Sequence, residues 1–190
     1  MRHLLRTSGV VTAMTLLAVG LLPAFQTPQK PVRTYGIRAL VPPGGQEPEA
    51  LYVSADAVLL VRVESSKSFL GKSGTDAHAV DSVRTEHLVK VLEVLKGGPA
   101  VQQNTDLLVE QFAGEVDAGE YILKSREPAL SKGEWILFLR QDRATKVLRV
   151  QDAAHAFRIK NGKIDTDGAT TREGADAGTL LAQLRQLKRK

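Results

Sequence analysis

The side chains of this sequence that could perform chemistry are few, and the first group contains histidines and carboxylates. Asp76, His78 and Asp81 lie within a stretch of six residues, and carboxylate and imidazole groups can bind zinc or a harder cation. Two other histidines, His87 and His155, are distant in the sequence. Because no spacing brings three ligands together, we expect that His78, His87 and His155 do not bind one ion, and that the chain has no metal site.

Catalytic motifs are incomplete in the same way. Gly71-Lys72-Ser73 resembles the end of a phosphate-binding loop, but Ser66 stands where the full motif needs a glycine. No Gly-x-Ser-x-Gly motif occurs. Asp117 could pair with Glu115 or Glu120 for acid–base work, although a solvated acidic loop between strands is the simpler interpretation. The sequence therefore predicts no catalytic residue, no cofactor and no enzyme activity.

The beginning of the chain, residues 1–25, has the pattern of a secretory signal peptide. Two arginines and no acidic residue precede the apolar run Val10–Leu22. This run of thirteen residues is shorter than the ~20 that a membrane-spanning helix needs. We expect cleavage that leaves a mature N-terminus between Leu21 and Pro28, and a periplasmic or extracellular location. An uncleaved leader is the alternative, and it would be the chain's only attachment to a membrane.

Composition and charge exclude further classes of function. The chain has 190 residues and no cysteine, which excludes disulfides, thiolate metal sites and cysteine nucleophiles. Its net charge is +5, but two basic residues lie in the leader and four in the last six residues, so the rest carries about −1. Nucleic-acid binding needs a basic face with stacking aromatic residues. Several of the eight aromatic residues beyond the leader fall on core-facing strand positions, so no nucleic-acid partner is expected.

The remaining chain divides into a linker, a folded domain and a terminal segment. Residues 26–50 hold five of the eight prolines and are predicted to be an extended linker. The domain is predicted over residues 51–165. The last segment, residues 166–190, contains leucines at helical spacing that predict a helix at about 177–188, with Asp176 or Thr179 as its N-cap.

Within the domain the patterns are mainly those of β-strands. Alternating or continuous apolar runs predict strands over 58–63, 107–112, 135–139, 147–150 and 156–159. Residues 88–95 fit either a helix or a strand. Asn161-Gly162 predicts a tight hairpin. The polar residues 65–82 and 113–132 are predicted to be a long loop and a long connection. Short strands followed by one helix favour a small β-barrel.

Three of these stretches together resemble a known group of proteins. Residues 55–63, 90–97 and 132–139 are similar, in that order, to small exported bacterial proteins of unassigned function. These resemble the OB-fold of the N-terminal domain of tissue inhibitors of metalloproteinases. The resemblance implies a strand over 88–95 and the fold class mainly β, a small OB-like (TIMP-like) β-barrel with a C-terminal helix. Those inhibitors bind the protease metal through an N-terminal cysteine, so their mechanism does not transfer to this cysteine-free chain.

The hypothesis that fits these observations is an exported, non-catalytic binding or interaction module of the cell envelope or periplasm. Its partner would be an unidentified protein or envelope ligand, bound by the long segments 65–82 and 113–132. The alternative is an inhibitor of an extracellular hydrolase that acts by loop insertion. A third hypothesis is a metal-assisted enzyme that uses the loop around His78.

Overall fold

The structure, a computed structural model, describes residues 30–35, 47–73, 80–98, 101–151, 153–165 and 174–189. The predicted signal peptide lies outside these residues. The elements are β1 (Val32–Tyr35), α1 (Pro48–Ser54), β2 (Ala57–Ser73), β3 (Val80–Lys96), β4 (Asp106–Gln111), β5 (Glu115–Asp117), β6 (Ile122–Ser125), β7 (Gly133–Gln141), β8 (Leu148–Val150), the 3-10 helix η2 (Ala153–His155), β9 (Ala156–Lys160), β10 (Lys163–Asp165) and α2 (Ala177–Lys188).

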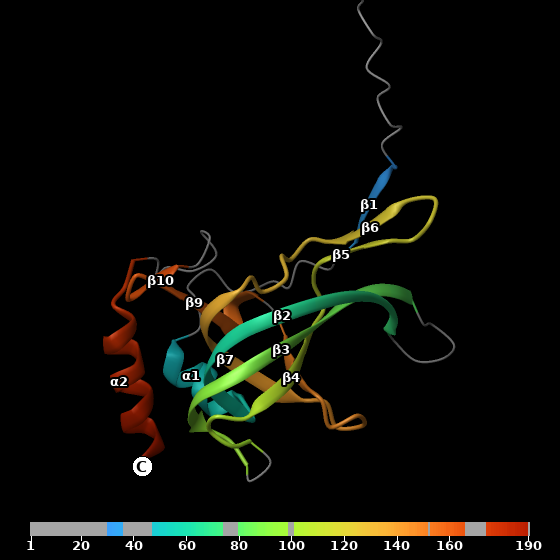
Figure 1. Ribbon diagram of the computed structural model, residues 1–190. Helices are drawn as coiled ribbons and strands as arrows, with labels where there is room; N and C mark the ends of the chain where they lie inside the picture. Colours follow the sequence, from blue (N-terminus) through green and yellow to red (C-terminus); the bar gives the residue numbers. More distant parts are fainter. Residues whose placement is uncertain are drawn as a thin grey trace, which may run out of the picture.

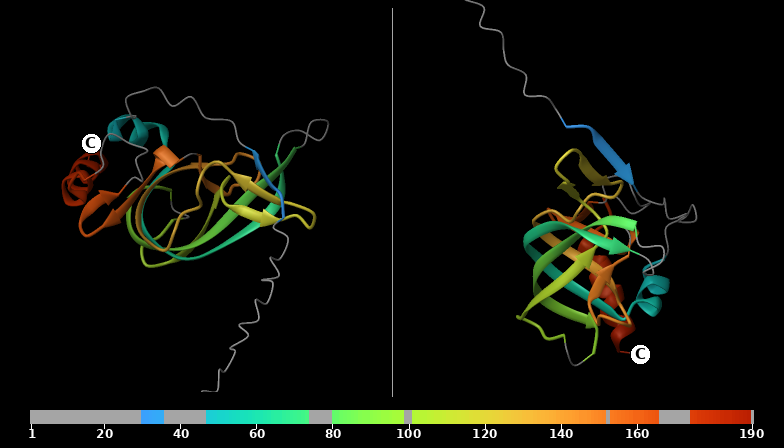
Figure 2. Two further views of the ribbon diagram at one scale, coloured as in Figure 1. Left: turned by 90° about the horizontal axis from the view of Figure 1, so that it is seen from above. Right: turned by 90° about the vertical axis from the view of Figure 1, so that its right-hand side faces the viewer.

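Five strands close into a ring. Neighbouring strands follow the order β7-β2-β3-β4-β8, and β8 pairs again with β7. The pair β4–β8 is parallel and the other four pairs are antiparallel. Strands β9 and β10 extend the sheet outward from β7. The two helices lie together at one end of the molecule, and the small sheet β1-β6-β5 lies at the other (Figures 1 and 2). This mainly β fold with a C-terminal helix confirms the predicted fold class.

The ring encloses the first of two apolar cores. Leu59, Val61 and Val63 of β2 point into it, as their alternation predicts, and Val89 and Val91 of β3 join them. The pairing of β2 with β3 shifts register at three places, between positions 58 and 65. Such bulges increase local bend and twist, which lets two long strands curve around this core.

The second core lies between the outside of the ring and α2. Leu180 and Leu184 of α2 are buried against residues that include Phe157 of β9. The helix occupies the residues over which it was predicted, and the Asp176 carboxylate accepts a hydrogen bond from the Thr179 amide, at 2.7 Å, as its N-cap. Strand β7 separates the two cores, so both of its faces are buried.

The predicted loop over residues 65–82 is wrong for residues 65–73 and 80–82, whereas residues 74–79 of that prediction lie outside the described residues. Strand β2 continues to Ser73, and β3 begins at Val80. The polar composition suggested a loop, but polar partners face each other across the two strands. The Ser68 and Thr85 hydroxyls are 2.8 Å apart, and Lys72 lies 3.5 Å from Asp81, the residue opposite it. Cross-strand pairs of these kinds stabilise a strand pair without an apolar face.

Two other expectations about loops also need correction. The connection 113–132 contains β5 and β6, so Glu115 and Asp117 belong to a strand rather than to an acidic loop. Glu115 pairs with Lys124 on the opposite strand at 3.5 Å. Part of the predicted linker, Val32–Tyr35, forms β1 and runs parallel to β6. An edge pairing of this kind depends on a partner far along the chain, which local sequence does not indicate.

Candidate functional site

The residues considered for metal binding are separated or already bonded. Asp76 and His78 lie outside the described residues. The Asp81 carboxylate pairs with Lys72 on an exposed part of the β2–β3 ribbon. His87 is buried in β3, and His155 lies in η2. Across the part of the chain that the structure describes, no three histidine or carboxylate groups are placed to bind one metal ion.

The structure brings together a serine, a histidine and a glutamine that the sequence analysis did not combine. Ser66 and His87 face each other across β2 and β3, and their Oγ and Nδ1 atoms are 2.7 Å apart. The second ring nitrogen of His87 is 3.2 Å from Oε1 of Gln111. The same Oε1 atom of Gln111 also accepts a hydrogen bond from the Leu130 amide. The Nε2 atom of Gln111 donates a hydrogen bond to the Pro128 carbonyl. These partners fix the orientation of the amide.

The fixed amide orientation determines the role of this triad. Because Gln111 presents its oxygen, His87 carries its proton on Nε2, and Nδ1 accepts from the Ser66 hydroxyl. A nucleophile needs a base that can become an imidazolium ion, and a carboxylate normally stabilises that ion. Here the third group is a neutral amide, and burial lowers the pKa of His87. The triad therefore favours a structural role, holding the 128–130 segment against the ring.

Burial of His87 predicts a pH-dependent stability. Its pKa is lowered in the folded state by desolvation, so below about pH 6.5 the unfolded chain binds the proton more readily. The free energy of unfolding should then fall as the pH drops from neutrality through that range. Denaturant titrations between pH 7.5 and about 5 measure this loss. His87→Gln, which cannot titrate, should show a shallower pH dependence; an unchanged slope in this variant would contradict the assignment.

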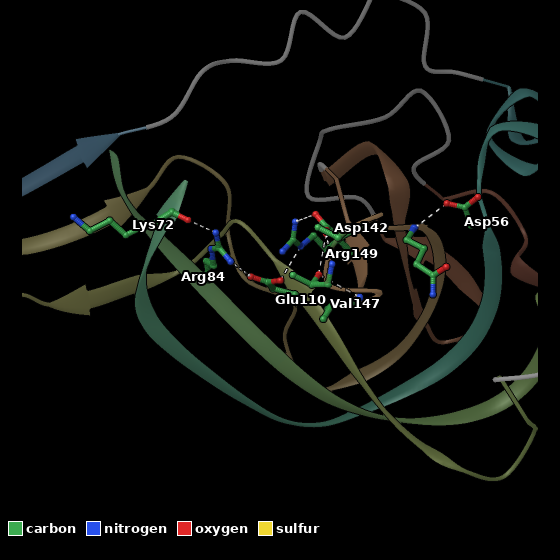
Figure 3. Close-up of polar contacts among 10 residues, drawn as sticks. Asp56, Lys72, Arg84, Glu110, Asp142, Val147 and Arg149 are labelled. Carbon is green, nitrogen blue, oxygen red and sulfur yellow. Dashed lines mark hydrogen bonds and ion pairs between the residues drawn. The ribbon is translucent and has the colours of Figure 1, made fainter. Parts of the chain in front are cut away.

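A second polar cluster lies on the β4–β8 side of the ring, and Figure 3 shows it in close-up. Glu110 of β4 accepts from two arginines: Arg84 Nη1 at 3.0 Å and Arg149 Nε at 2.7 Å. Arg149 also pairs with Asp142 through its Nη1 atom. Both guanidinium groups lie over the ring of Phe112, at 5.0 and 5.5 Å from its centroid. Two cations and two carboxylates therefore balance in this cluster.

Beside this cluster the surface forms a cavity of about 720 Å³. Most of the residues that line it are charged or polar, and they come from the end of α1, from β7, β8 and the turn between these two strands. They are Ser54, Asp56, Phe112, Arg140, Gln141, Asp142, Arg143, Lys146, Arg149, Val150 and Gln151. The basic side chains that line the cavity therefore all come from the β7–β8 hairpin.

The two carboxylates of the cavity are engaged within the fold. One oxygen of Asp142 accepts from the amides of Ala144 and Thr145 and from the Thr145 hydroxyl. These bonds, together with the charge of Arg149, lower the pKa of Asp142 and keep it ionised. Asp56 accepts from the Gln141 amide at 2.8 Å, a bond that ties the start of β2 to the end of β7.

Three cations of the cavity are not matched in this way. Arg140, Arg143 and Lys146 are exposed and have no carboxylate partner among the described residues. Arg140 also lies directly opposite Arg149 in the antiparallel pair β7–β8. Like charges at opposed positions destabilise a strand pair. With Arg149 neutralised, the cavity retains three free cations against the single charge of Asp56, an arrangement suited to bind an anion.

The sequence contained a signal for this cavity that charge counting concealed. Arg140, Arg143, Lys146 and Arg149 recur at every third position across the hairpin. The formal charge of about −1 for the body of the chain averages these cations with carboxylates located elsewhere. A local charge count over residues 140–149 would have identified the basic cluster.

Comparison with known proteins adds no family to these observations. No protein-family model matches the sequence, and no curated protein matches it. Among the residues that the structure describes, neither helix combines the length and the apolar character needed to cross a membrane.

Proposed function

We propose that the chain is an exported, non-catalytic binding module of the cell envelope or periplasm, and that its ligand carries an anionic group. The observation that carries this proposal is the set of three unmatched cations, Arg140, Arg143 and Lys146, around one cavity. Export rests on the basic and apolar pattern of residues 1–25. We therefore propose the β7–β8 hairpin as the binding surface, in place of the segments 65–82 and 113–132 that were expected from the sequence.

The chemistry of the cavity favours a phosphate or carboxylate group. Guanidinium groups donate paired hydrogen bonds to such oxyanions, and charge-assisted bonds of this type are the strong ones. A bound anion would also lie near two arginines, Arg140 and Arg149, which face each other with like charge. Because Glu110 and Asp142 already neutralise Arg149, the attraction of the anion comes mainly from Arg140, Arg143 and Lys146.

The same geometry supports an envelope ligand over a nucleic acid. Single-strand binding requires aromatic faces on which bases stack. The one aromatic residue that lines the cavity is Phe112, and two guanidinium groups already lie over its ring. The partner we propose is therefore an anionic small molecule of the envelope.

Inorganic pyrophosphate serves as a probe of the proposed site. Arg143→Gln combined with Lys146→Gln should weaken its binding about five- to thirtyfold, because each exposed cation contributes up to about 1 kcal/mol. Isothermal titration calorimetry measures the dissociation constant. Binding to the unmodified protein should also weaken as the salt concentration rises, since the cations are exposed to solvent.

Lys163→Gln is the matched control for this experiment. Lys163 is an exposed lysine of β10 that does not line the cavity, so its replacement should leave the dissociation constant unchanged. The control removes one positive charge and the double variant removes two, so a loss of binding free energy in the control of half the loss in the double variant would show that the anion responds only to net charge. Absence of binding to the unmodified protein would also contradict the proposal.

The alternative of an inhibitor that acts by loop insertion needs a long loop, and the long segments expected from the sequence were 65–82 and 113–132. Residues 65–73 and 80–82 are paired strands, so most of the first segment is held in a two-stranded ribbon. No feature of the described residues specifically favours this alternative, and the anionic-ligand hypothesis is the one we retain.

A further inference from the structure

A second cavity of about 410 Å³ adjoins the cationic one, and its character is different. Aliphatic side chains from β2, β4, β8 and the segment before β4 form much of its wall. The lining residues are Asp56, Ala57, Glu86, Gly98, Val101, Leu107, Leu108, Val109, Glu110, Gln141, Lys146, Val147 and Leu148. We refer to this cavity as the apolar cleft. Its volume falls within the ~300–1,000 Å³ typical of small-molecule sites.

The apolar cleft arises from a mismatch in strand length within the ring. Strand β8 has three residues and pairs with β4 only at Val109–Gln111. The first half of β4, Asp106–Leu108, therefore has no β8 neighbour in the described part of the chain. At this end of the ring the cleft lies beside the unpaired half of β4, and Leu107 and Leu108 form part of its wall. Leu108 is 56% exposed there.

The two cavities share part of their lining. Asp56, Gln141 and Lys146 line both of them. Lys146 is the cation at the shared boundary, whereas the other two unmatched cations, Arg140 and Arg143, line only the cationic side. A ligand that occupied both cavities would place its anionic end among these cations and an apolar part in the cleft.

We propose that the ligand is a single-chain amphiphile with a phosphate-type head group. The head would occupy the cationic cavity, and the alkyl chain would lie in the apolar cleft against residues such as Leu107, Leu108 and Val147. This inference rests on the proposed function and specifies its ligand class. Burial of an alkyl chain against exposed aliphatic surface is favourable in proportion to the area removed from water. A detached anion gains nothing from the cleft.

Octyl phosphate and ethyl phosphate form a matched pair of probes, since they share one head group and differ only in chain length. Octyl phosphate, used below its micelle concentration, should bind at least about tenfold more tightly than ethyl phosphate, because of the added methylene groups. Octan-1-ol, which has the chain without the charge, should bind more weakly than octyl phosphate. Isothermal titration calorimetry on the full protein measures all three.

Leu108→Gln tests whether the alkyl chain of the ligand lies in the apolar cleft. Because Leu108 is largely exposed, its replacement should leave the fold intact. The variant should lose about threefold or more in affinity for octyl phosphate and keep its affinity for ethyl phosphate. Leu88→Gln is the matched control: Leu88 lies opposite Leu108 on β3, is 37% exposed and does not line the cleft. The control should bind both probes normally.

The outcomes separate this inference from the function on which it rests. The amphiphile proposal would be wrong if octyl and ethyl phosphate bound with equal affinity, or if the Leu108 and Leu88 variants lost equal affinity for octyl phosphate. Neither result would contradict the proposed anion site. Binding of neither phosphate, together with no binding of pyrophosphate, would overturn both proposals. If octan-1-ol bound as tightly as octyl phosphate, the cleft would bind alkyl chains without any contribution from a head-group site. That result would overturn the amphiphile proposal.

Discussion

Leu137→Ala and Phe138→Ala are each expected to lower the free energy of unfolding by about 2–5 kcal/mol. Leu137 points into the ring and Phe138 points outward to the helices, and both are at most 1% exposed. The rings of Phe138 and Phe157 also form a T-shaped pair, with 5.6 Å between their centroids. Each truncation leaves a void in a different core. Urea denaturation measures the two losses.

An exposed apolar residue provides the control for these truncations. Val53 of α1 is 76% exposed, so Val53→Ala should change the free energy of unfolding by no more than about 0.5 kcal/mol. If either Leu137→Ala or Phe138→Ala were as mild as this control, β7 would not separate two packed cores, and the arrangement of the ring and helices would be wrong.

Glu110→Gln is expected to cost about 2–4 kcal/mol of stability. The Glu110 side chain is 7% exposed and bonds both Arg84 and Arg149, which are 20% and 17% exposed. Loss of one charge from a buried ion cluster leaves the remaining charges uncompensated in a region of low polarity. The guanidinium groups keep some contact with water, which places the expected cost in the lower part of the range for buried pairs.

The matched control is an exposed ion pair of the same kind. Arg62 and Glu134 lie opposite each other on β2 and β7 at 2.8 Å, with side chains 51% and 41% exposed. Glu134→Gln should cost less than about 1 kcal/mol, because solvent screens such pairs. Denaturant titration at one ionic strength compares the two variants. Equal costs would show that the Glu110 cluster is not held by its own ion pairs.

Those parts of the fold that depend on local pattern could be predicted from the sequence. The alternation of Leu59, Val61 and Val63 identified the inner face of β2. Asn161 and Gly162 have φ angles of +53° and +74°, which the tight turn between β9 and β10 requires. Local patterns succeed here because each requirement involves residues that are neighbours along the chain.

The apolar run of β7 was predicted as a strand, but its orientation was not resolved. Either Leu137 or Phe138 could have been the inward residue, and both turn out to be buried. A strand covered on both faces has no alternation, so its sequence cannot assign a side chain to one core or the other. That assignment depends on α2 and β9, which pack on it from distant parts of the chain.

Pairing between distant segments explains most of what the sequence did not reveal. Residues 65–73 and 80–82, the described part of the ribbon formed by β2 and β3, are mostly polar in sequence and therefore give no periodic apolar signal. The contact between Ser66 and His87 follows from strand register, which a single sequence does not specify. The cationic cavity depends likewise on the pairing of β7 with β8, which sets Arg140 opposite Arg149.

The most direct test of the cationic cavity is an NMR titration of the purified protein with pyrophosphate, following the Nε–H signals of its arginines. The account predicts saturable shifts for Arg140 and Arg143, which line the cavity, and no shift for Arg62, which pairs with Glu134 elsewhere on the ring. Shifts of equal size at Arg62, or shifts that grow without saturation, would contradict the account.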